Sequence, residues 1–161
     1  MSLALVAVDL GRALSALPDS TPFPHAVARR GCTQEDAPAL EVYLSCEPHA
    51  GDATGLDGPP TPYVRLEIGW NAWQRANGRP LALLPSAGRD APRDAPRDAP
   101  VVRAELHEGD GPPVWLHGTV RLQPVTIGRD VVGVYDFRGP NDVRRSGGFT
   151  ARWVASHGGC G

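Results

Sequence analysis

Apolar and polar residues alternate along several segments of this chain, and the alternation constrains the fold more than any other feature. In residues 63–70, for example, Val64, Leu66 and Ile68 fall on one side of an extended chain and polar residues fall on the other. Equivalent patterns occupy residues 39–45, 101–107, 114–123 and 148–154. A period of two is typical of half-buried antiparallel strands, whereas parallel sheets show continuous apolar runs and intervening helices. The sequence therefore predicts an all-β fold.

Two further segments, residues 79–84 and 130–138, are weaker strand candidates, and apolar residues on both faces of the second favour burial on two sides. Asp-Gly chemistry in residues 108–113 predicts a hairpin, and residues 139–142 and 146–148 are predicted to separate the last two strands. The 19 glycines and 17 prolines disfavour long helices. About seven or eight strands at this spacing predict an antiparallel β-sandwich, with a flattened β-barrel as the alternative.

The remaining segments carry weaker structural signals. Residues 18–38 contain four prolines and are predicted to form an irregular connection. Residues 3–17 fit either a strand followed by a short helix or one helix, and both interpretations remain open. Residues 89–100 repeat Arg-Asp-Ala-Pro three times, and a proline at every fourth position prevents a helix. We therefore expect a single domain over residues 1–161 in which residues 86–100 form a flexible exposed loop.

Four segments together resemble small bacterial β-sandwich proteins of unknown function. These segments are residues 34–41, 62–68, 133–137 and 147–153. All 16 basic residues are arginine, which, together with abundant Ala, Gly and Pro, is typical of a GC-rich genome. The resemblance implies the sandwich fold, and it implies no activity, cofactor or functional residue.

Charge and cysteine content bear on partners and location. The formal net charge is −2 with no long run of one sign, so we expect no nucleic-acid partner. No apolar run approaches the ~20 residues that span a bilayer, and the N-terminal stretch lacks the basic leader of a signal peptide. We therefore expect no membrane association and a cytoplasmic location. Cys32 and Cys46 could pair across a loop in an oxidising compartment, but free thiols, including Cys160, are expected in the cytoplasm.

Metal and cofactor sites have little support in the sequence. The 5 histidines lack the paired spacing of a zinc site. The loop over residues 47–57 offers hard oxygen ligands and is a weak calcium candidate, but it lacks the regular Asp spacing of calcium loops. The candidate ligands in this loop are Glu47, His49, Asp52 and Asp57. We expect a solvated polar loop and no bound metal or cofactor.

Catalytic signatures are equally sparse. The sequence has no Gly-x-Ser-x-Gly elbow and no compact acid–base pair, so an enzyme is less expected than a binding protein. The enzymatic alternative is a small hydrolase-like protein in which carboxylates from residues 33–36 and 47–57 meet near one end of the sheet. It requires Glu35, Asp36 and His49 to lie within about 10 Å of one another around a pocket. A calcium- or carbohydrate-binding sandwich is a further alternative.

The best candidate for a binding surface is the outward side of residues 114–123. If this segment is a strand, four side chains project together from that side: Trp115, His117, Thr119 and Arg121. An exposed Trp near an Arg is frequent in recognition surfaces, although Arg121 could instead pair with Glu67 or Glu105 across strands. We expect a binding or assembly module that contacts a protein partner through this surface or through the open edge of the sheet.

Overall fold

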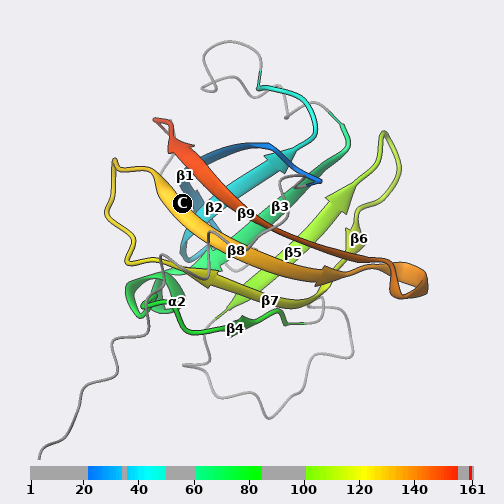
Figure 1. Cartoon of the computed structure of the whole chain (residues 1–161). Coiled ribbons are helices and arrows are strands. Elements are labelled where there is room, and N and C mark those ends of the chain that lie inside the picture. The colour runs from blue at the N-terminus through cyan, green and yellow to red at the C-terminus, as the bar shows by residue number, and fades with distance from the viewer. Residues whose placement is uncertain (1–21, 34–35, 50–60, 85–100, 156–159, 161) are drawn as a thin grey trace, which may run out of the picture.

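The computed structural model describes residues 22–33, 36–49, 61–84, 101–155 and 160, and Figure 1 shows their arrangement. The strands in this part of the chain are β1 (His25–Cys32), β2 (Pro38–Ser45), β3 (Tyr63–Gly69), β4 (Leu81–Ala82), β5 (Val102–His107), β6 (Val114–Trp115), β7 (His117–Leu122), β8 (Val131–Arg138) and β9 (Arg144–Trp153). A short helix α2 (Trp70–Gln74) and a 3-10 turn η1 (Pro140–Asp142) accompany them. Some expectations fall outside the described residues, namely those for residues 3–17, residues 86–100, Glu35, Asp52 and Asp57.

The nine strands form one sheet in the order β4-β7-β8-β9-β1-β2-β3-β5-β6. The pairing of β1 with β9 is parallel, and the other strand pairs are antiparallel. Only Leu116 separates β6 from β7, and its amide donates to the Ala104 carbonyl of β5 over 2.9 Å. One run of chain thus pairs first with β5 and then with β8, and the sheet curls into a half-barrel (Figure 1). The predicted all-β fold is confirmed, and the single curled sheet is nearer to the barrel alternative than to two stacked sheets.

The core lies on the inner side of the curled sheet and contains the residues that the alternation predicted to point inward. Its largest fully buried side chains are Phe137, Leu40, Leu44, Leu66, Ile68, Leu116 and Leu122. The helix α2 adds Ala72 and Trp73 to this core, whereas Trp70, predicted as an inner-face strand residue, begins the helix and is half-buried against the core. Burial of each large apolar side chain contributes about 1.5–3 kcal/mol, so the inner faces dictate how the sheet curls.

Strand β1 corrects the prediction of an irregular connection over residues 18–38. Its inward residues include Ala26 and Ala28, whose small side chains give a weak alternation signal even though Ala28 is completely buried. The strand pairs along its whole length with β2 and pairs with β9 through Val27 and Ala28. Backbone pairing with β2 and β9 therefore makes this segment a strand, and the local sequence pattern does not predict that pairing.

The turn between β8 and β9 is shorter than predicted. Residues 139–142 lie in the turn, but residues 146–148, also predicted to separate the strands, lie within β9. Their glycines face Val134 and Tyr135 on β8, and this pairing keeps them extended. The outward side of β8 is half-buried, so the strand is not buried on two sides as predicted.

The cysteines pair differently from both sequence-based expectations. Cys32, at the end of β1, forms a disulfide with Cys160, and Cys46 is an exposed free thiol. The Cα atoms of the bonded cysteines are 5.6 Å apart although 128 positions separate them in the sequence. The Val154 amide, just after β9, donates to the Ala28 carbonyl over 2.8 Å and places this part of the chain beside β1. The parallel pairing of β9 with β1 therefore brings the two cysteines to one end of the sheet.

Candidate functional site

The outward side of the sheet carries two polar surfaces of different character. The first, which we call the paired face, comprises Arg29, Glu41, Tyr43, Arg65, Glu67, Arg103 and Glu105 on β1, β2, β3 and β5. The second, which we call the basic face, comprises His117, Arg121, Arg138 and Arg144 on β7, β8 and β9. The two surfaces differ in whether their charges find partners within the chain.

Strand register places the charges of the paired face in rows. Arg29, Glu41, Glu67 and Arg103 occupy directly opposed positions on four neighbouring strands. Facing opposite charges attract, whereas the two facing carboxylates in the middle of this row repel each other. Arg65, from the next row, approaches both carboxylates and offsets that repulsion.

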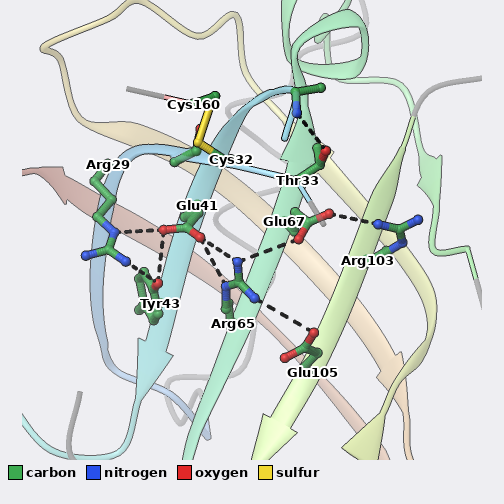
Figure 2. A network of polar contacts seen from close by, with 12 residues as sticks. Arg29, Cys32, Thr33, Glu41, Tyr43, Arg65, Glu67, Arg103, Glu105 and Cys160 are labelled. Atoms are coloured by element: carbon green, nitrogen blue, oxygen red, sulfur yellow. Dashed lines mark hydrogen bonds and ion pairs between the residues drawn. A yellow bond between two sulfur atoms is a disulfide. The ribbon is translucent and has the colours of Figure 1, made fainter. Parts of the chain in front are cut away.

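Glu41 lies at the centre of the paired face (Figure 2). Its Oε2 accepts hydrogen bonds from Arg29 Nε at 2.7 Å and from the Tyr43 hydroxyl at 3.0 Å. Its Oε1 accepts two hydrogen bonds from Arg65, at 2.6 and 3.2 Å. Burial by itself would raise the pKa of Glu41, but the hydrogen bonds and positive charges of Arg65 and Arg29 hold it below its ordinary value. The carboxylate is thus ionised and occupied by donors, which makes it a poor proton acceptor in catalysis.

Tyr43 is held beside this carboxylate by Arg29. The Arg29 side chain donates to the Tyr43 hydroxyl over 2.7 Å, and its guanidinium carbon lies 5.0 Å from the centre of the Tyr43 ring. Burial and the adjacent Glu41 charge raise the pKa of Tyr43 to about 12. The phenol therefore stays protonated at neutral pH and serves as a donor to Glu41.

Arg65 and Arg103 extend the network to β5. Arg65 lies 3.6 Å from Glu67 Oε2 and 3.8 Å from Glu105 Oε1, and Arg103 donates to Glu67 Oε1 over 3.1 Å. The three carboxylates of the paired face are at most 7% exposed, although they point away from the core. Three guanidinium groups balance them, so the paired face satisfies its own charges and acts as a structural network.

His49 lies far from Asp36, the described carboxylate proposed to join it in a hydrolytic site. Asp36 precedes the eight residues of β2 and His49 follows them, a span of roughly 25 Å at ~3.3 Å per residue. The buried Ser45 hydroxyl donates to the Glu47 carbonyl over 2.7 Å and contacts His49 Nε2 at 3.1 Å. A serine whose proton is directed at the backbone is not poised as a nucleophile. Glu47 itself is exposed, and the described residues hold no group of three or more metal-ligating side chains.

The predicted surface residues Trp115, His117 and Arg121 lie on the outward side of β6 and β7. His117 and Arg121 are exposed, whereas Trp115 is half-buried and faces Glu105 on β5. The alternative pairing of Arg121 with Glu67 or Glu105 does not occur, because arginines of the paired face contact both carboxylates. The structure therefore places the three predicted residues on one side of the sheet and leaves two of them in solvent.

The basic face gains two arginines that the sequence analysis did not identify. His117 faces Arg138 on β8, and Arg138 in turn faces Arg144 on β9. All three side chains are exposed. Asp136 accepts two hydrogen bonds from Arg144, at 2.8 and 2.7 Å, and these bonds hold the pKa of Asp136 below its ordinary value. Within β7, β8 and β9, no other carboxylate points outward, so the basic face has an excess of positive charge.

Short, uncharged side chains occupy the positions between these cations. Thr119 and Ser146 flank Asp136 in one row, and Val134 and Gly148 follow Arg121 in the next. The longer cationic side chains therefore extend beyond their neighbours on this side of the sheet. The arrangement can bind an extended anionic partner, and the described residues of this surface include no group of three or more metal-ligating side chains.

No protein-family model, curated protein or solved structure matches this chain. Within the described segments, none of the helical structure has the length and apolar character needed to cross a membrane. The function proposed below is therefore inferred from the charges and geometry of the two surfaces.

Proposed function

We propose that this chain is a non-enzymatic binding module whose basic face docks an acidic segment of a protein partner. The observation that supports the proposal is the register of His117, Arg138 and Arg144, which places an imidazole and two guanidinium groups at facing positions. Like charges at facing positions disfavour the folded sheet. An acidic partner would convert this unfavourable arrangement into a source of binding energy.

The paired face differs from the basic face in how its arginine charges are balanced. There, every guanidinium group lies within 4 Å of a carboxylate of the same chain. On the basic face, Asp136 is the only carboxylate among the described residues that pairs with an exposed arginine. The net charge of the whole chain is −2, so the local positive charge is not a consequence of a basic composition. A negative net charge also disfavours a long nucleic-acid strand as the partner.

We propose further that the protein works where the Cys32–Cys160 disulfide persists. Structural disulfides are stable in oxidising compartments and rare in a reducing cytoplasm. This proposal replaces the cytoplasmic location expected from the sequence. Alkylation of the purified native protein under denaturing conditions should label Cys46 alone, and labelling of all three cysteines would contradict it.

Binding to a defined acidic peptide tests the docking proposal. The probe is a fluorescent polyglutamate peptide, and the readout is fluorescence anisotropy at low and at moderate salt. Reversing two charges of the basic face, in R121E/R138E, should weaken binding at least about tenfold, equivalent to about 1.4 kcal/mol. Binding to the unmodified protein should also weaken as salt rises, because the contacts are exposed.

A matched control carries the same charge change elsewhere. Arg75 and Arg79 are exposed and lie outside the basic face, so R75E/R79E should bind the peptide nearly as well as the unmodified protein. Equal losses in both double variants would show a nonspecific charge effect and contradict the proposal. Tighter binding of a single-stranded DNA of equal length than of the peptide would also contradict it, because nucleic acid would then be the better partner.

A further inference from the structure

Three cation-capable side chains converge at a different place on the sheet, where β1 lies between β2 and β9. His25 on β1 directly faces Ser45 on β2, and the ring of His49 contacts the Ser45 hydroxyl. Arg152 on β9 pairs with Val27, which is two residues from His25 on the same side of β1. The pKa of His49 responds to the charges of both His25 and Arg152, which places these two side chains near its ring.

Hydrogen bonding fixes which nitrogen of His49 carries a proton. The Ser45 hydroxyl donates its hydrogen to the Glu47 carbonyl over 2.7 Å, so its oxygen is an acceptor for His49 Nε2 at 3.1 Å. His49 Nε2 therefore carries hydrogen, and Nδ1 is the nitrogen that gains or loses a proton. Protonation of Nδ1 adds both a charge and a second donor without disturbing the contact with Ser45.

Within the part of the chain that the structure describes, the charged groups that act on His49 are cationic. Burial, and then the positive charges of His25 and Arg152, lower the pKa of His49. Tyr63 faces Ser45 from β3 but is stacked on His107, with ring centres 4.4 Å apart, and His107 contacts Glu105. The described ion pairs join none of His25, His49 and Arg152 to a carboxylate.

We infer that His25, His49 and Arg152 form a binding site for a small tetrahedral oxyanion of the phosphate or sulfate class. The three side chains come from β1, β9 and the segment after β2. Their combined charge rises as the histidines protonate, which matches a dianion better than a single carboxylate. Binding and protonation are coupled, because an anion that favours the charged histidine must bind more tightly where that histidine is charged.

NMR titration of the histidine ring signals tests this inference. Sodium sulfate is the first probe, compared with sodium chloride at equal ionic strength, and phosphate and acetate form two further arms. Sulfate and phosphate should raise the titration midpoint of His49 by at least about half a pH unit, a roughly threefold preference for the protonated form.

Substitution separates this site from the basic face. R152A replaces an exposed side chain, and it should abolish most of the sulfate effect on His49, while R121E/R138E should preserve that effect. H25Q supplies a second variant that removes the imidazole of His25 from the site and retains a polar side chain. A His49 midpoint that is equal in sulfate and chloride would overturn the inference. So would an acetate effect as large as that of sulfate, or an unchanged response in both R152A and H25Q. None of these outcomes bears on the peptide binding proposed for the basic face.

Discussion

Replacing Glu41 by glutamine should destabilise the fold far more than the same chemical change on the basic face. The amide keeps the size of the side chain but removes the charge that holds Arg29 and Arg65. Breaking a fully buried ion pair costs about 3–5 kcal/mol, but these arginine side chains are 34% and 24% exposed, so water compensates part of the loss. We expect E41Q to lower the free energy of unfolding by about 2–3 kcal/mol, a large share of the roughly 5–15 kcal/mol of a typical domain.

Urea denaturation followed by tryptophan fluorescence measures this loss. With a typical slope of about 1–3 kcal/mol per molar urea, the midpoint should fall by roughly 1 M. D136N is the matched control, because it also converts an arginine-bonded carboxylate to an amide, and that ion pair is exposed. Its midpoint should stay within the scatter of the measurement. Equal midpoints for E41Q and the unmodified protein, or equal losses in E41Q and D136N, would refute the stabilising role of the paired face.

The same pair of proteins gives a pH test with a defined sign. Because the folded-state pKa of Glu41 is lowered, its contribution is complete above the unfolded value of about 4.3. That contribution is lost as the pH falls through the folded-state pKa. The difference in unfolding free energy between the unmodified protein and E41Q should therefore be constant near neutral pH and shrink below about pH 4. A difference that grows in acid would contradict the direction of the shift.

Three further substitutions probe other parts of the fold. G31A should cost about 1–3 kcal/mol in the urea assay, because a Cβ at this position collides with the Glu41 side chain; an unchanged midpoint would show that the carboxylate moves freely. C32S should lower the melting temperature, since the chain-entropy estimate for a crosslink to Cys160 across 128 positions is about 5 kcal/mol, and a reductant should then have no further effect. F137A should cost about 3–5 kcal/mol, because it removes a completely buried ring, and a loss below 1 kcal/mol would contradict its place in the core.

The inner faces of the strands were predictable because alternation is a local signal. Val64, Leu66 and Ile68 were assigned to the core from spacing alone, and all three are completely buried. The signal fails where inward residues are small, as Ala26 and Ala28 are in β1. It also fails where pairing overrides composition, as in the glycine-containing residues 146–148 of β9.

The polar surfaces were only partly predictable, since alternation gives the side of a residue and not its surroundings. Glu67 and Glu105 were correctly placed on the outward side, but their burial depends on arginines from neighbouring strands. Arg138 joins His117 only because β7 pairs with β8 in one particular register. The cysteine pairing was not predictable either. Three cysteines allow several disulfide pairings, and their spacing in the sequence does not distinguish among them.

The two outward surfaces belong to one sheet and both carry arginine side chains, so the difference in how those charges are paired is informative. Glu41 shows that this chain can place a carboxylate between facing guanidinium groups. At the facing positions of the basic face it places His117, Arg138 and Arg144 instead, with Asp136 off to one side of the row. A surface that merely needed solubility would gain stability from alternating its charges. This positive excess is the observation that supports our proposal of an acidic partner.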